Sequence, residues 1–257
     1  MSTSGESINN IDYNVICQFF LSLNRQGPGS KESTLRALSL IENLSEIKNI
    51  ADLGCGTGSP TLLLAEMTSA QITALDLFPA FLSRLNDNAK QMGFGDRIKT
   101  MQRSMLELPF EDESLDMIWS EGAIYNIGFK KGFVEWKRFL KPGGYIAVTD
   151  ATWFRRDPAP EIFEFWNNSY PEIDYCDVKC GQILDAGYEV IGIFRLPQSC
   201  WSVEYYSHVP AALESFKSKY SGVETATELI GWMEEEMRLY AKYGETYGYT
   251  FYIARKL

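Results

Sequence analysis

The chain has 257 residues, of which 45% are hydrophobic and 23% charged, as in an ordinary globular protein. Its 24 Lys and Arg residues against 34 Asp and Glu residues give a net charge of −10. This balance disfavours nucleic acid as a partner, because a phosphate backbone requires a basic patch. The sequence shows neither the basic and apolar regions of a signal peptide nor an apolar run long enough for a membrane span.

The numbers of cysteines and histidines bear on disulfide formation and on metal binding. Five scattered cysteines favour reduced thiols and a cytoplasmic location. Cys176 and Cys180 are four residues apart, but the single histidine leaves too few further ligands for zinc. We therefore expect no metal site.

The N-terminal third opens with helices and then changes to alternating elements. Residues 8–23 carry apolar side chains at helical spacing, and Ser30 is placed to cap a second helix that runs to about Leu44. Strands are then expected at 50–53, 71–77, 97–104, 115–121 and 145–150. Helices are expected at 60–67 and 79–92. A third helix, between the last two of these strands, would place Phe129, Phe133, Trp136 and Leu140 along one face. Such alternation requires crossover connections, so we expect a mostly parallel sheet with helices on both faces.

Two segments interrupt this rhythm. Residues 153–175 are rich in aromatic side chains, and residues 200–244 are expected to form a mostly helical insertion. Between them we expect a helix at about 177–186 and a strand at 187–196, and after them a final strand at 247–256. Because the insertion separates the last two strands, these need not be parallel.

The stretch ADLGCGTGSP (51–60) places three glycines between the first strand and its helix. In an open α/β sheet, ligands bind at the carboxyl ends of the strands near this turn. Glycines permit a tight turn and let a ligand lie against the backbone. We expect Ser59 to cap the following helix and Pro60 to be its first residue.

The spacing of these glycines limits the class of ligand that the turn is expected to bind. Gly54, Gly56 and Gly58 form G-x-G-x-G, without the third glycine of a dinucleotide fingerprint and without the lysine of a Walker loop. Asp76 ends the second strand, where a carboxylate can accept hydrogen bonds from both hydroxyls of a ribose and would repel a 2′-phosphate. These features favour an adenosine-type ligand without phosphate, and S-adenosylmethionine fits that description.

Four motifs in this order are similar to those of the class I S-adenosylmethionine-dependent methyltransferases, namely DLGCGTG (52–58), LDLF (75–78), RSMLELPFEDESLDMIWS (103–120) and RFLKPGGYIAVTD (138–150). Within this family the chain most resembles the small-molecule group that includes quinone and sterol methyltransferases. The resemblance implies a single α/β domain over 1–257 with a Rossmann-like seven-stranded sheet in the order 3-2-1-4-5-7-6, strand 7 antiparallel. It also implies helices on both faces and helical insertions.

The resemblance further implies an enzyme that methylates a small, partly apolar or aromatic molecule by in-line displacement. Two alternatives stay open. One is a module that binds S-adenosylmethionine without catalysis, and the less favoured one is a nicotinamide-dependent oxidoreductase.

By resemblance, the cofactor S-adenosylmethionine is expected across the carboxyl ends of the first and second strands. Gly54, Cys55 and Gly56 are expected beneath its methionine part, Asp76 at the ribose and Leu77 over one adenine face. Ser104 stands where the family often has an acidic residue that recognises the adenine amino group. Met105 and Ser120 complete the implied contacts on this side, and Asp52 is expected to anchor the loop.

The residues after the fourth strand are the candidates for catalysis. Glu121 is expected beside the sulfonium, where it would orient the methionine amino group, bind a cationic acceptor or act as a base. The alternative is a carboxylate at a helix start that only the helix dipole favours. Tyr125 follows about one turn later. His208, the only histidine, is either a catalytic base or a structural residue. A base is required only if the acceptor loses a proton on attack.

Three segments are expected to close this end of the sheet. In the N-terminal lid (1–30), Arg25 would pair with the cofactor carboxylate, and Gly27, Gly29 and Ser30 would approach the methionine end. A simple loop between helices is the alternative for these four residues. Residues 153–175 and 200–244 are expected to cap a pocket for the small-molecule acceptor. The sequence leaves the oligomeric state open.

Overall fold

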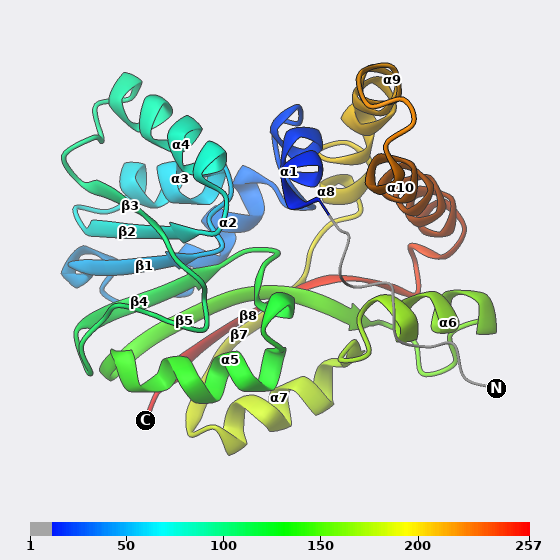
Figure 1. The fold of residues 1–257 in the computed structure, drawn as a ribbon. Helices are drawn as coiled ribbons and strands as arrows, with labels where there is room; N and C mark the ends of the chain where they lie inside the picture. Colours follow the sequence, from blue (N-terminus) through cyan, green and yellow to red (C-terminus); the bar gives the residue numbers. More distant parts are fainter. Residues whose placement is uncertain (1–11) are drawn as a thin grey trace.

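The computed structural model describes residues 12–257, and one mixed β-sheet runs through their centre (Figure 1). The hydrogen-bonded strands follow the order β3-β2-β1-β4-β5-β8-β7. Their bounds are β1 Asn49–Leu53, β2 Gln71–Asp76, β3 Ile98–Gln102, β4 Leu115–Ser120, β5 Leu140–Trp153, β7 Tyr188–Arg195 and β8 Tyr247–Lys256.

This order confirms the predicted topology, since β8 and β7 are the seventh and sixth strands of the expected sheet. Strands β1 to β5 pair in parallel, and β8 is antiparallel to both of its neighbours. The two-residue strand β6, Asp174–Tyr175, was not expected, and it pairs with the carboxyl end of β5. The described sheet therefore has eight strands.

Helices cover both faces of the sheet, as predicted. Helices α2 (Lys31–Leu38), α3 (Ser59–Met67) and α4 (Pro79–Gln91) lie above it in Figure 1, and α5 (Phe129–Trp136) and α7 (Cys176–Asp185) lie below. The side chains of each strand alternate between two apolar cores, as the two-residue period of a strand requires. In β1, for example, Ile50 belongs to the upper core and Ala51 to the lower one.

The remaining helices gather beyond the carboxyl ends of the parallel strands (Figure 1). They are α1 (Tyr13–Leu21), α6 (Pro160–Ser169), α8 (Ser199–Ser202), α9 (Val209–Lys219) and α10 (Glu224–Tyr243). Helix α1 packs against both α9 and α10. The short 3-10 turns are η1 (Leu44–Glu46), η2 (Ile124–Asn126), η3 (Lys137–Phe139) and η4 (Tyr206–His208). None of the helices within 12–257 has the length and apolar character that crossing a membrane requires.

Three predicted helix boundaries need correction or restriction. The expected helix over 8–23 begins, in the described residues, at Tyr13 behind the N-cap Asp12, and residues 8–11 lie outside the described range. Helix α2 ends at Leu38 and not near Leu44, because 3-10-type bonds such as the one from the Leu40 amide to the Ala37 carbonyl tighten its last turn.

The third correction concerns the helix after the glycine turn. Ser59 does not cap α3: the N-cap is Gly58, and Ser59 is the first helical residue. The φ of Gly58 is +87°, and this left-handed conformation favours glycine over serine.

A buried ion pair joins α7 to the sheet. Lys179 on α7 contacts the Oδ2 atom of Asp150 on β5, and both side chains are fully buried. The Tyr170 hydroxyl donates to the same oxygen at 3.0 Å, and the Lys179 ammonium also donates to the Glu172 carbonyl at 3.2 Å. Burial raises the pKa of Asp150, and the charge of Lys179 opposes that rise.

We expect Lys179→Met to lower the free energy of unfolding by about 3–5 kcal/mol, because it leaves Asp150 buried without its cation. Urea denaturation measures the change. Lys131→Met is the matched control, since Lys131 forms an exposed pair with Glu135 that contributes about 1 kcal/mol at most. Equal losses for the two variants would show that the buried pair adds little.

Candidate functional site

The glycine turn lies at the carboxyl end of β1, between that strand and α3. The amides of Gly54 and Cys55 both donate to the Leu75 carbonyl of β2, at 2.8 and 3.0 Å. The φ angles of Gly54, Gly56 and Gly58 are +73°, +54° and +87°. The turn therefore requires glycine at all three positions for its backbone conformation.

The protein's own side chains also lie close to these glycines. A Cβ atom on Gly54 would lie 2.4 Å from the Ala123 Cβ, and one on Gly58 would lie 2.1 Å from a methyl carbon of Leu85. A Cβ on Gly56 would lie 2.9 Å from the amide oxygen of Gln26. Close packing within the protein thus explains the absence of side chains here as well as a ligand would.

Asp76 at the end of β2 holds this turn through its carboxylate. Its Oδ2 atom accepts a hydrogen bond from the Gly56 amide at 2.8 Å, and its Oδ1 atom accepts one from the Phe78 amide at 3.0 Å. The residue is only 9% exposed, and burial raises the pKa of its carboxyl despite these bonds. Each oxygen keeps a further lone pair for a hydroxyl donor.

Gln26 is a site residue that the sequence did not suggest. Its side-chain oxygen accepts hydrogen bonds from the amide and the hydroxyl of Thr57, at 3.1 and 2.8 Å. Its side-chain nitrogen donates to the Phe20 and Leu23 carbonyls at the end of α1. Gln26 therefore connects α1 to the glycine turn. Its position next to Arg25 is the only feature of the sequence that points to the site, and a glutamine in a loop is not by itself evidence of a binding role.

Asp52 lies beneath the turn and anchors it to α3. Its Oδ2 atom accepts a 2.5 Å hydrogen bond from the Thr61 hydroxyl. Burial raises the pKa of Asp52 to about 7, the Thr61 bond opposes this, and the charges of Glu121 and Asp76 add to it. Asp52, Asp76 and Glu121 thus make this end of the sheet negative.

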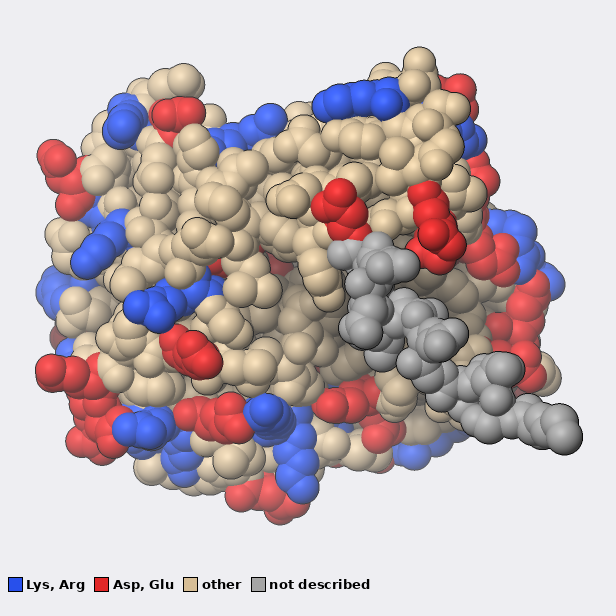
Figure 2. All heavy atoms as spheres, in the orientation of Figure 1, with Lys and Arg blue, Asp and Glu red and all other residues tan. Residues whose placement is uncertain are grey.

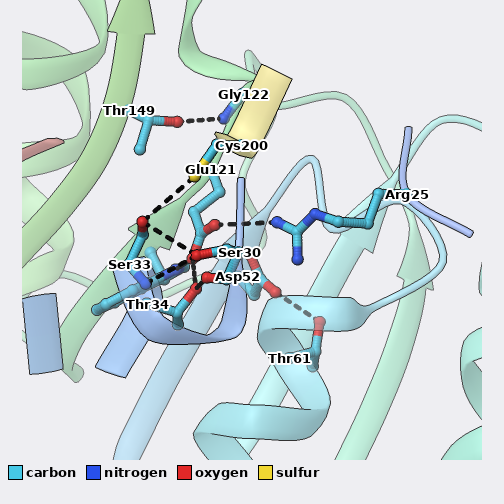
Figure 3. Close-up of polar contacts among 11 residues, drawn as sticks. Arg25, Ser30, Ser33, Thr34, Asp52, Thr61, Glu121, Gly122, Thr149 and Cys200 are labelled. Atoms are coloured by element: carbon cyan, nitrogen blue, oxygen red, sulfur yellow. Dashed lines mark hydrogen bonds and ion pairs between the residues drawn. The ribbon is translucent and has the colours of Figure 1, made fainter. Parts of the chain in front are cut away.

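Glu121, directly after β4, has three polar partners (Figure 3). Its Oε1 atom accepts hydrogen bonds from the Thr34 hydroxyl at 2.7 Å and from the Trp119 indole nitrogen at 3.0 Å. Its Oε2 atom lies 3.3 Å from a guanidinium nitrogen of Arg25. Only 4% of the Glu121 side chain is exposed, so its carboxylate is held in one position.

The loop before α2 brings Arg25 to Glu121. Gly29 leaves space for this pair, since a Cβ there would lie 2.3 Å from the Arg25 guanidinium. Ser30 caps α2, as predicted, by accepting from the Ser33 amide at 3.1 Å. Gly27 has open space on its Cβ side. The Nε atom of Arg25 is buried and has no hydrogen-bond partner among residues 12–257.

The other predicted cofactor residues are in different environments. Leu77 is 58% exposed just beyond Asp76, and the sulfur of Met105 would lie 3.4 Å from a Cβ at Gly54. The Ser104 hydroxyl accepts from the Leu106 amide at 3.2 Å and keeps its proton free to donate. Ser120 is fully buried and its hydroxyl donates to the Leu53 carbonyl, so it joins β4 to β1. Cys55 is buried, and burial raises the pKa of its thiol well above the usual value.

Of the two other catalytic candidates, only Tyr125 is linked to neighbouring aromatic residues in the described structure. Tyr125 in η2 is 43% exposed, and its ring contacts that of Tyr170 edge to face, with 6.0 Å between centroids. His208 is exposed at the start of α9. Its backbone amide donates to the Tyr205 carbonyl at 3.2 Å, but its imidazole forms no hydrogen bond or ion pair with another residue from 12 to 257. The polar partners of Glu121 do not include it.

The surface beside this site is hollowed. Figure 2 shows the hollow near the centre of the visible face, between the part formed by α1, α9 and α10 and the part formed by α5 and α7. On the described part of this face, basic and acidic side chains are interspersed. Among residues 12–257, no three His, Cys, Asp or Glu side chains form a group that could hold a metal ion.

We expect Gly54→Ala to destabilise the fold by about 2–4 kcal/mol, through backbone strain plus the clash with Ala123. Gly93→Ala is the control, because Gly93 has a similar φ of +76° and nothing within 4 Å of its Cβ direction. This control should cost only about 1–2 kcal/mol. Urea denaturation of both variants separates strain from clash, and equal losses would contradict the packing role of Gly54.

Comparison with known proteins agrees with this geometry. Residues 51–148 match the family model described as a methyltransferase domain. Tocopherol O-methyltransferase of Arabidopsis thaliana is 31% identical over 68% of this chain and 46% of its own length. Sterol 24-C-methyltransferase of Gibberella zeae is 29% identical over 42% of this chain and 28% of its own. The chain thus spans half or less of the length of these curated relatives.

Solved structures extend the likeness to nearly the whole fold. A methyltransferase from Geobacter sulfurreducens in complex with S-adenosylhomocysteine superimposes with a TM-score of 0.82 over 96% of this chain and 99% of that one, at 18% identity. This likeness shows the fold, and the family model and curated relatives identify the domain. The chain therefore carries a methyltransferase domain over residues 51–148, in a fold that it shares with solved S-adenosylmethionine-dependent methyltransferases.

Proposed function

We propose that this chain binds S-adenosylmethionine over the glycine turn and catalyses methyl transfer to a small molecule. The observation that carries the proposal is the hydrogen bond between the Gly56 amide and Asp76, which sets a loop without side chains beside a buried carboxylate. When bound, S-adenosylmethionine supplies an electrophilic methyl group on a sulfonium centre.

The residues present fit the parts of that cofactor. Asp76 has unused lone pairs for the two ribose hydroxyls, and the exposed side chain of Leu77 offers an apolar face for adenine. Met105 lies on the same side, and Ser104 keeps a hydroxyl proton for the adenine edge. The Ser120 hydroxyl donates to the Leu53 carbonyl, so Ser120 would support the cofactor site by joining β4 to β1.

The methionine end would meet Arg25 and Glu121. The unpartnered Nε of Arg25 suits the cofactor carboxylate, and the loop at Gly27, Gly29 and Ser30 lies beside it. Glu121 suits the amino group. With Asp52 and Asp76 nearby, this end of the sheet favours a ligand that carries positive charge.

Glu121 is better suited to positioning than to proton abstraction. A base must be free to reach the proton it removes, and the carboxylate of Glu121 is already engaged by Thr34, Trp119 and Arg25. Tyr125 borders the acceptor side of the site. His208 remains a prediction without a contact that supports it.

We further propose that the N-terminal lid and the segments 153–175 and 200–244 enclose the acceptor. Helix α1 packs against α9 and α10, and the Ser33 hydroxyl lies 3.5 Å from the Cys200 sulfur (Figure 3). The aromatic side chains of these segments would exclude water, which suits a displacement at a charged sulfonium. Part of the lid, residues 1–11, lies outside the described range.

Partner class and location complete the proposal. The net charge of −10 supports a small-molecule acceptor over a nucleic acid. All five cysteines lie in the described part of the chain as free thiols, which supports the cytoplasm as its compartment. The relatives are methyltransferases, and this disfavours both the nicotinamide enzyme and the non-catalytic module as alternatives.

We expect Asp76→Ala to weaken S-adenosylhomocysteine binding by about 1.5–3 kcal/mol, because it removes hydrogen bonds to a charged group. Titration calorimetry measures the affinity, and circular dichroism verifies the fold. Asp116→Ala is the control, since Asp116 also accepts from two backbone amides, of Lys48 and Asn49, but at the amino end of β4. Unchanged affinity in Asp76→Ala would contradict the ribose assignment.

We expect Glu121→Gln to lower the affinity for S-adenosylmethionine by about tenfold, because the amino group loses a carboxylate partner. Turnover at saturating cofactor should persist on an acceptor found by labelled-methyl transfer in a metabolite extract. Glu66→Gln, which removes an exposed carboxylate, is the control. The opposite pattern, a loss of roughly 10²–10⁴-fold in turnover with unchanged affinity, would identify Glu121 as a base.

A further inference from the structure

Glu236 on α10 is a buried carboxyl group that nothing described so far uses. The residue is 5% exposed, and it forms no ion pair with any residue from 12 to 257. Burial raises the pKa of its carboxyl to about 8, while the nearby Tyr206 hydroxyl lowers it. That hydroxyl makes no hydrogen bond of ordinary geometry in the described chain. A buried carboxylate without a cationic partner is costly and therefore calls for a reason.

Five tyrosines from three parts of the chain feel the charge of Glu236. They are Tyr125 after β4, Tyr205 and Tyr206 before α9, and Tyr247 and Tyr249 on β8. Burial raises the pKa of each of these phenols, and in every case the negative charge of Glu236 adds to the rise. Tyr240, one helical turn after Glu236 on the same helix, contacts Tyr206 and Tyr247, with 5.5 and 5.7 Å between ring centroids. Glu236 therefore lies beside a cluster of aromatic side chains.

This aromatic cluster reaches the methyl end of the proposed cofactor site. A Cβ on Gly122 would lie 3.4 Å from a ring carbon of Tyr249, and Gly122 directly follows Glu121. From there, the Trp201 ring contacts both Tyr249 and Tyr206, with 5.1 and 5.8 Å between centroids. Tyr206 in turn lies 5.3 Å from Tyr205. The tyrosines thus extend from Glu121 to Glu236, on the side where an acceptor would approach.

A buried carboxyl group among tyrosine rings favours a positively charged ligand. The faces of aromatic rings attract cations, and a cation would also neutralise the buried carboxylate. Among residues 12–257, no lysine or arginine forms an ion pair with Glu236, so a cation that pairs with its ionised form would come from a ligand. A neutral apolar acceptor would gain nothing from this carboxylate.

We propose that the acceptor site binds an alkylammonium group, held by the Glu236 carboxylate and the rings of Tyr205, Tyr206 and Tyr249. This inference deepens the proposed methyl transfer and rests on it. Glu236 acts here as a specificity-determining residue, while Glu121 remains at the cofactor end. The acceptor is then an amine-bearing small molecule, and the proposal leaves open which of its atoms receives the methyl group.

The test compares choline with 3,3-dimethylbutan-1-ol, a neutral molecule of nearly the same shape. Ligand-detected NMR titrations at pH 8 measure both affinities, with and without S-adenosylhomocysteine. We expect choline to bind about tenfold or more tightly than the alcohol, because only choline carries the charge. This comparison in the unmodified protein does not depend on whether a variant folds.

Two matched variants assign the effect to one carboxylate. In Glu236→Gln the ratio of the two affinities should fall to about one. Glu234→Gln removes a charge two residues away on α10, from an exposed side chain paired with Lys217, and should keep the ratio. Equal affinities of choline and the alcohol in the unmodified protein, or an unchanged ratio in Glu236→Gln, would overturn the inference.

The pH dependence gives a readout that a structural role would not produce. Choline requires ionised Glu236, so its affinity should rise by about tenfold or more between pH 6 and pH 8. The surrounding tyrosines all have raised pKa values and do not titrate in this range. Glu236→Gln should abolish the rise.

Failure of this inference is distinguishable from failure of the proposed function. If S-adenosylhomocysteine binds but choline and the alcohol bind alike, the cofactor assignment stands and the ammonium site is wrong. If S-adenosylhomocysteine does not bind, the proposed function fails, whatever the choline titration without it shows.

Discussion

The hydrogen bond from the Gly56 amide to the Asp76 carboxylate is the interaction on which the rest of the site depends. It joins the turn after β1 to the end of β2, and the Leu75 carbonyl supports it by accepting from Gly54 and Cys55. The glycine turn then lies at the edge where α/β sheets bind ligands. Gln26 ties α1 to the same turn, so the N-terminal lid is positioned by the loop that it covers.

The distribution of charge gives the site its chemical preference. Asp52, Asp76 and Glu121 are buried near one another, and Arg25 pairs with only the last of them. Burial raises the pKa of Asp52 to about 7, which shows how costly a second or third charge is there. A sulfonium and an ammonium would offset this cost, and Glu236 extends the same preference toward the acceptor. Both ends of the site thus favour positively charged groups.

Much of the fold follows from local patterns in the sequence. Alternating apolar strands and a glycine turn predict the order of β1 to β5, because parallel strands require crossovers. The end of α2 at Leu38 was not predicted, because it is set by local 3-10-type hydrogen bonds that no capping residue marks in the sequence. The strand β6 was not predictable, because it depends on pairing with the distant strand β5. Gln26, Thr34 and Glu236 could not be predicted as site residues either, because the residues they interact with are far away in the sequence.

The central claim is that an adenosine-type cofactor lies over the glycine turn with its ribose at Asp76. A crystal structure of the protein with S-adenosylhomocysteine tests this most directly. We predict both ribose hydroxyls within about 3 Å of the Asp76 carboxylate, with the methionine end between Arg25 and Glu121. A ligand bound elsewhere, or one whose ribose makes no contact with Asp76, would contradict the account.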